Sequence, residues 1–218
     1  MKRRSLPVAA ALTAAAALLL TACGNEDDKA GDNDKIAGAE TGDTTASASP
    51  SASAPAGADR PTIKLPKDMT NVFEGGETGD PVKDAILRDS QGRINSLDEA
   101  IHTRSLERPS FGFYSTGKAA RSAAVWVQGF FDDGITWTGT VRYYDHKVSV
   151  EGEDRATLSY CSDESKAYNK DLKTGKTSGE VDNPVDSLVF YTTRLAKNDK
   201  GVWQTTDVFS KRGASQCQ

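Results

Sequence analysis

The distribution of apolar residues divides the chain into three parts. A run without charge, Leu6 to Leu20, follows a short basic N-terminus. From Gly24 to Arg60 small and polar residues dominate, and aliphatic or aromatic side chains are almost lacking. Apolar residues return with regular periods only after Pro61. This pattern predicts a leader at 1–22, a flexible tether at 23–61 and a single globular domain at 62–218.

Two amphipathic helices are expected in the first half of the domain. Asp80 followed by Pro81 is typical of a helix N-cap and the first helical position. Apolar residues then recur with a period of 3.6, which places them on one stripe: Val82, Ile86, Leu87, Ile94, Leu97 and Ile101. A second helix is predicted to begin near Ser115 and to end at Gly134. Its buried side is expected to contain Ala120, Ala124, Val127, Phe130 and Phe131.

From Ile135 onward the period falls to two, which is typical of half-buried strands. The predicted strands are 135–143, 148–150, 156–160, 188–195 and 202–209. A turn is expected at 144–147, and the polar stretch 162–184 is expected to leave the sheet. The tip at 197–201 suits a hairpin loop. Two helices followed by such a meander predict an α+β fold, with both helices packed on one face of a curved antiparallel sheet.

The end of the apolar run, Leu20-Thr21-Ala22-Cys23, resembles the lipobox of bacterial lipoproteins. The resemblance implies that 1–22 is an export signal and that Cys23 receives a diacylglyceryl group. Two acyl chains suffice for stable membrane residence, so the mature protein is expected to be lipid-anchored on the extracytoplasmic face of the cell membrane. The alternative is an ordinary secretory signal with Cys23 incidental. Arg3-Arg4 leaves the twin-arginine export route open beside the general one.

Charge excludes one class of partner. The 218-residue chain has a formal net charge of −4. Between Gly24 and Arg60, eight acids stand against three bases, which indicates a solvated spacer or an acidic interaction tail. The domain after Arg60 carries 23 acids and 21 bases. That near-neutral balance gives no electrostatic case for binding nucleic acid.

The cysteines support export. With Cys23 assigned to lipid, Cys161 and Cys217 remain as an even pair, which is expected to form a disulfide in an oxidising compartment. Two free buried thiols are the alternative.

Little else in the chain carries chemistry. Gly112 to Lys118 matches G-x-x-x-x-G-K, but Ala119 follows where a Ser or Thr would hold Mg²⁺, so no nucleotide site is predicted. The two histidines, His102 and His146, are too few for a three-ligand zinc site without help from cysteines or carboxylates. No metal and no cofactor are expected.

Several runs resemble a family of hypothetical lipoproteins from high-GC Gram-positive (actinobacterial) bacteria. They are 139–145, 160–163 with Ala167-Tyr168, 201–206 and 213–217. That family implies no activity. The order of elements is also similar to the nuclear-transport-factor-2-like cone, in which a curved sheet wraps around helices and leaves room for a pocket. Fold alone does not imply function.

Two classes of function follow as expectations. One is a non-enzymatic module that binds a small apolar ligand or an envelope protein, with a pocket lined by Trp137, Tyr143, Trp203 and Phe209; these rings could equally fill an ordinary core. The other is a cone-type enzyme acting on a small hydrophobic substrate. Its general acid/base would be a carboxylate in the pocket, for which Asp207 is the candidate.

Overall fold

The computed structural model describes residues 59–180 and 183–218. The predicted signal peptide, Cys23 and all but the last residues of the predicted tether lie outside these residues. In the described part of the chain, no helix is long and apolar enough to cross a membrane.

Helix α1 runs from Pro81 to Thr103 and begins where the sequence predicts. The Asp80 side chain accepts hydrogen bonds from the amides of Val82 and Lys83, which satisfies two of the free donors of the first turn. The stripe from Ile86 to Ile101 is buried, whereas Val82 is 40% exposed. Gly92 lies in the middle of the helix because the ring of Tyr114 packs on it; an added Cβ would come 2.6 Å from Cζ of that ring.

Helix α2 spans Gly117–Asp132, close to the predicted range. Its most buried residues are Ala119, Ala123 and Val127, so the buried stripe starts one residue earlier than the predicted Ala120 and Ala124. The predicted pair and the observed pair of alanines are both spaced four residues apart, so spacing alone cannot tell which pair is buried. Contact with the rest of the domain decides it.

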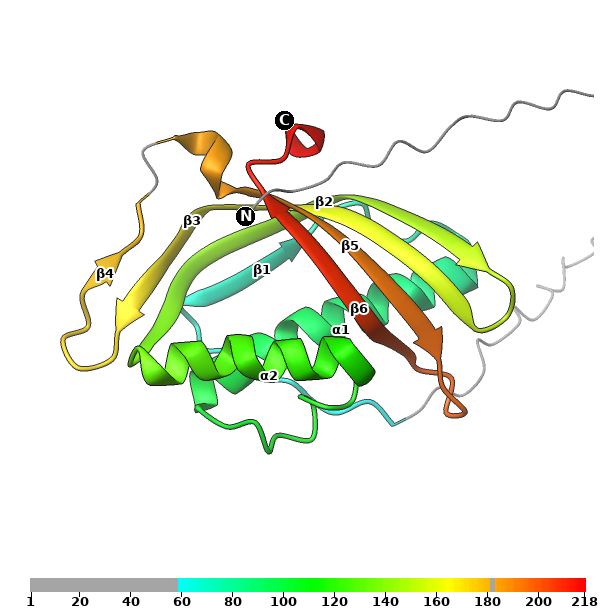
Figure 1. The fold of residues 1–218 in the computed structure, drawn as a ribbon, viewed down its shortest axis with the longest axis horizontal. Coiled ribbons are helices and arrows are strands. Elements are labelled where there is room, and N and C mark those ends of the chain that lie inside the picture. Colours follow the sequence, from blue (N-terminus) through cyan, green and yellow to red (C-terminus); the bar gives the residue numbers. More distant parts are fainter. Residues whose placement is uncertain (1–58, 181–182) are drawn as a thin grey trace, which may run out of the picture. The chain divides into compact units, whose positions relative to one another are not determined.

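The sheet has six strands among the described residues, in the order β1-β2-β3-β5-β6, with β4 paired to β3. Both long helices lie under one face of the curved sheet, and the C-terminal turn lies on the other (Figure 1). The predicted α+β class with two helices on a curved sheet is confirmed. The sheet is not wholly antiparallel, however, because β1 (Met69–Phe73) was missed and pairs with β2 in parallel.

Strands β2 (Ile135–Glu151) and β3 (Arg155–Asp171) form a hairpin of two 17-residue strands. The predicted turn at 144–147 was wrong: β2 continues through it with a register shift between Tyr144 and Lys147. Asp145 there has a φ of 54°, which bends the strand without ending it. The stretch after Ser162 does not leave the sheet at once, since β3 continues to Asp171.

The remaining elements complete one edge and the outer face. Strand β4 (Thr177–Ser178) pairs with the end of β3, and a 3-10 turn, η1, covers Pro184–Ser187. Strands β5 (Leu188–Lys197) and β6 (Trp203–Arg212) form the predicted hairpin. A second 3-10 turn, η2 (Ser215–Cys217), ends the chain.

Cys161 on β3 and Cys217 in η2 are joined by a disulfide, with a Cα–Cα distance of 5.7 Å. The pairing agrees with the prediction. The bond ties the C-terminus to the centre of the sheet, where the Tyr144 hydroxyl also donates to the carbonyl of Cys217 over 2.6 Å.

Candidate functional site

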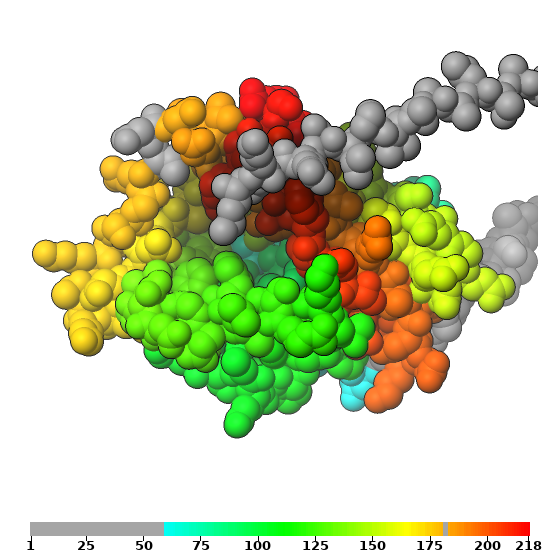
Figure 2. Space-filling view, in the orientation of Figure 1, coloured from blue at the N-terminus to red at the C-terminus, as the bar shows by residue number. Residues whose placement is uncertain are grey.

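A cavity of about 570 Å³ lies between the helices and the concave face of the sheet. Its walls come from α1, α2 and strands β2, β3, β5 and β6. Figure 2 shows a hollow between α2 and the end of β6. The pairing of β2 with β3 shifts register between Thr140 and Arg142 and again between Tyr144 and Lys147, and such irregularities bend a sheet.

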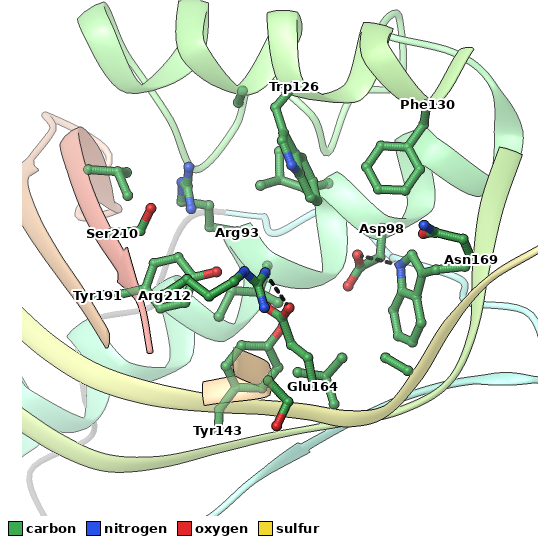
Figure 3. A pocket seen from close by; sticks show the side chains of 18 of the residues that line it. Arg93, Asp98, Trp126, Phe130, Tyr143, Glu164, Asn169, Tyr191, Ser210 and Arg212 are labelled. Atoms are coloured by element: carbon green, nitrogen blue, oxygen red, sulfur yellow. Dashed lines mark hydrogen bonds and ion pairs between the residues drawn. The ribbon is translucent and has the colours of Figure 1, made fainter. Parts of the chain in front are cut away.

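Aromatic rings form one side of this cavity. Trp126 and Phe130, one turn apart on α2, point down into it and pack edge to face with centroids 5.0 Å apart (Figure 3). Trp137 of β2 lines the same cavity. Trp126 is 50% exposed, which places this ring at the rim, while Trp137 is buried. Large aromatic surfaces around a few polar groups are the usual composition of a small-molecule site.

Asp98 is the carboxylate at this aromatic side. It lies on the buried face of α1 with 5% of its surface exposed. Trp137 Nε1 donates to its Oδ1 over 3.0 Å, and Asn71 Nδ2 donates to its Oδ2 over 2.6 Å. Burial raises the pKa of Asp98 to about 7, against the opposing effect of these two hydrogen bonds. At neutral pH this carboxyl group can therefore either give or accept a proton.

Asp98 was not among the predicted site residues. A signal was present, because an acid directly after Leu97 and four residues after Ile94 falls on the predicted apolar stripe. A carboxylate on such a stripe must be neutral, paired or hydrogen-bonded.

Three tyrosines form the floor of the cavity, on adjacent strands. The rings of Tyr160 and Tyr191, directly opposite each other on β3 and β5, stack with centroids 5.0 Å apart. The ring of Tyr143 lies 6.1 Å from that of Tyr160. Burial raises the pKa of Tyr160 to about 12 and also raises the pKa of Tyr143, so both hydroxyls keep their protons at neutral pH.

Three charged side chains line the same end as the tyrosines. Glu164 of β3 and Arg212 of β6 form an ion pair of 2.6 Å that crosses the cavity wall (Figure 3). Ser162 adds a hydrogen bond of 3.3 Å to the glutamate. The third is Arg93 of α1, which is buried and donates through Nε to Ser115 Oγ over 3.0 Å.

The four predicted pocket aromatics separate into two pairs. Trp137 and Tyr143 line the cavity. Trp203 instead lies in the core beneath the other half of the sheet, 1% exposed, among Ile86, Leu158 and Leu195. Phe209 is 63% exposed and takes no part in the cavity.

Asp207, the predicted acid/base candidate, does not enter the cavity either. Its side chain is 40% exposed and forms an ion pair of 3.3 Å with Lys118 at the start of α2. The reason is a bulge in β6: Leu195 pairs with Thr205 but Arg194 pairs with Asp207, so Thr206 is an extra residue. Beyond it the faces exchange, and Val208, Ser210 and Arg212 line the cavity.

The described residues contain no group of three or more histidine, cysteine or acidic side chains placed to hold a metal. His146 is stacked on Tyr160 with centroids 5.7 Å apart, and burial lowers its pKa. His102 is exposed near the end of α1. The segment that resembles a phosphate loop forms turns ahead of α2, and Gly117-Lys118 opens the helix.

No family model matches the sequence, and no curated protein matches it. Solved structures resemble the fold. A candidate ketosteroid isomerase from Shewanella frigidimarina is 15% identical with a TM-score of 0.38 and covers 60% of this chain and 97% of its own. A ketosteroid isomerase-like protein from Erwinia carotovora is 14% identical with a TM-score of 0.40, covering 59% and 93%. The intermembrane space region of the chloroplast protein ARC6 is 12% identical with a TM-score of 0.33, covering 57% and 95%. At these identities and TM-scores the likenesses assign no activity or ligand to this chain.

Proposed function

We propose that this chain is a lipid-anchored extracytoplasmic protein whose domain binds a small, largely apolar ligand between its helices and its sheet. The observation that carries the proposal is the cavity of about 570 Å³ with Trp126, Phe130 and Trp137 on one side. Its volume falls within the range of small-molecule sites. An ordinary core packs to crystal density and leaves few voids larger than a water molecule, so a space of this size is not accounted for by packing.

A thermal-shift titration tests binding. The neutral aromatic probe N-phenyl-1-naphthylamine should raise the melting temperature of the full chain carrying Cys23→Ala, which has no acyl chains to take up the probe. The rise should depend on probe concentration, since a ligand that binds only the folded state stabilises it. Ser122→Phe should abolish that shift, because Ser122 is exposed yet lines the cavity and a larger ring there occupies the space.

Val125→Phe is the matched control. Val125 lies three positions further along the same helix but is 75% exposed and outside the cavity. The shift should persist in this variant. Absence of any shift in the chain with the unaltered cavity would remove the binding proposal.

The anchoring half of the proposal rests on the lipobox-like sequence that ends at Cys23. Cys23→Ala should release the protein from the membrane fraction, because the thiol that takes up the diacylglyceryl group is gone. Intact-mass analysis of the wild-type protein extracted from membranes should show an acylated N-terminal cysteine. A mature N-terminus at any other residue would contradict it.

A second candidate function, a cone-type enzyme, is favoured by Asp98 alone. A carboxyl group with a pKa of about 7 beside an apolar cavity suits general acid/base catalysis near neutral pH. Such an enzyme would exchange the protons next to the carbonyl of a bound ketone. Exchange into deuterated water, followed by NMR, should then be lost in Asp98→Asn; no exchange above the solvent rate in the wild-type chain would leave binding as the function.

A further inference from the structure

Arg93 is a buried cation, and no carboxylate in the described part of the chain neutralises it. It lies in the middle of α1, is 8% exposed and lines the cavity (Figure 3). Among the described residues, no Asp or Glu oxygen comes within ion-pair distance of its guanidinium. Its Nε is satisfied by Ser115, whereas its two terminal nitrogens make no hydrogen bond to other described residues.

This placement is costly without a partner for the charge. A guanidinium keeps its proton and must be paired or solvated, because moving an isolated charge out of water is strongly unfavourable. Burial lowers the pKa of Arg93, and only neighbouring tyrosines act in the opposite direction. The other cavity arginine, Arg212, differs because Glu164 pairs with it.

Two further donors line the same cavity as this cation. Tyr143 and Tyr160 both line the cavity, and their hydroxyls make no hydrogen bond to other residues of the described part of the chain. Neither hydroxyl oxygen is fully buried and unbonded at the same time. Because both lack a hydrogen bond to the described residues, both must reach the open space of the cavity. The electrostatic influence of Arg93 reaches both tyrosines.

We propose that Arg93, together with the hydroxyls of Tyr143 and Tyr160, binds the anionic group of an amphipathic small molecule, such as a carboxylate or sulfonate. Its apolar body lies against Trp126, Phe130 and Trp137. The inference rests on the proposed binding function and names the class of ligand. The remaining charged residues of the cavity leave this role to Arg93, since Glu164 and Arg212 neutralise each other and Asp98 bonds to Trp137 and Asn71. Guanidinium hydrogen bonds to oxyanions are charge-assisted and are among the strongest in proteins.

Two fluorescent probes with one skeleton test the proposal. 8-Anilinonaphthalene-1-sulfonate is N-phenyl-1-naphthylamine with a sulfonate added, so only the anionic group differs. The full chain carrying Cys23→Ala serves as the background, because acyl chains and detergent would also take up the probes. The anionic probe should bind at least tenfold more tightly than the neutral one, as expected for a charge-assisted bond.

Variants then locate the anion. Arg93→Met should weaken the anionic probe at least tenfold and leave the neutral probe within about twofold, which also shows that the cavity is intact. Arg121→Met, an exposed arginine on α2, should change neither. If Arg93→Met fails to fold, the double variant Tyr143→Phe and Tyr160→Phe removes two donors and should weaken only the anionic probe.

The outcomes separate the two proposals. Equal affinity for both probes, or anionic binding that survives Arg93→Met and the double tyrosine variant, would overturn the anion site while leaving the binding function. Failure of both probes on the background chain would overturn the binding function itself.

Discussion

Asp98 and Asp207 are two carboxylates of one chain in opposite environments. Asp98 is buried between α1 and β2 and accepts hydrogen bonds from Trp137 and Asn71. Asp207 meets water and pairs with Lys118, an exposed arrangement of the kind that contributes little to stability. At the residue scale the sequence pointed to Asp207 of β6, whereas the carboxylate that lines the cavity beside aromatic rings is Asp98 of α1.

The raised pKa of Asp98 predicts an unusual dependence of stability on pH. The folded state binds the proton of this group more tightly than the unfolded state, in which the pKa is near 3.8. Its contribution is therefore fully present below about pH 4, declines as the pH rises toward 7, and is absent above that. The free energy of unfolding should lose up to about 4 kcal/mol from this source over that interval.

Comparison with Asp98→Asn isolates the effect, because the variant cannot titrate at this position. Other acids act oppositely: burial raises the pKa of Glu99, but hydrogen bonds, from Ser110 and the Lys64 amide first, lower it further, so its net shift is downward. Such contributions are common to both proteins and cancel in the difference. Urea unfolding from pH 4 to 8 measures the difference in free energy of unfolding between the two proteins. If this difference does not change with pH, the raised pKa of Asp98 is refuted.

At the scale of elements, a glycine in β2 permits close contact between β2 and β3. Gly139 has a φ of 105°, and an added Cβ would collide with the carbonyl oxygen of Lys166 on β3. The glycine allows the two strands to approach closely at the point where β2 also meets β1.

Gly139→Ala should therefore lower the free energy of unfolding by more than about 1 kcal/mol, the cost of holding a non-glycine residue in a strained conformation. Gly129→Ala is the matched control: it lies within α2 with no atom within 4 Å of its added Cβ. Alanine there should stabilise by up to about 1 kcal/mol through helix propensity. Thermal unfolding compares the two, and equal effects would show that the bend in β2 does not require glycine.

At the scale of the whole molecule, the disulfide between Cys161 and Cys217 links the C-terminal turn to the sheet. The disulfide joins residues 56 apart in sequence and holds η2 against the outer face of the sheet. It ties down the C-terminal end of β6, the strand that brings Arg212 to the cavity.

Replacing Cys161 and Cys217 together by alanine should cost about 4 kcal/mol, the chain-entropy value for a loop of this length. Wild-type protein treated with a reductant should unfold at the same urea concentration as the double variant. If reduction leaves the midpoint of the oxidised protein unchanged, the bond is not formed in solution.

The sequence by itself determined the features that depend on neighbouring residues. The capped start of α1 at Asp80, the 3.6-residue stripe, the onset of strands at Ile135 and the last hairpin all follow from local preferences. The cysteine pair followed from counting. The actinobacterial lipoprotein resemblance, the anchor and the ligand remain predictions.

Only the tertiary structure decided which residues face the cavity. A bulge at Thr206 exchanges the two faces of β6, so Phe209 turns outward while Trp203 remains in the core. Such a bulge is set by pairing with β5, and the alternation of apolar and polar residues in β6 does not reveal it. Likewise, burial between α1 and β2 raises the pKa of Asp98 to about 7, although Trp137, 39 residues away in sequence, lowers it by donating a hydrogen bond. Burial and its effect on pKa arise from such long-range contacts, and no local pattern specifies them.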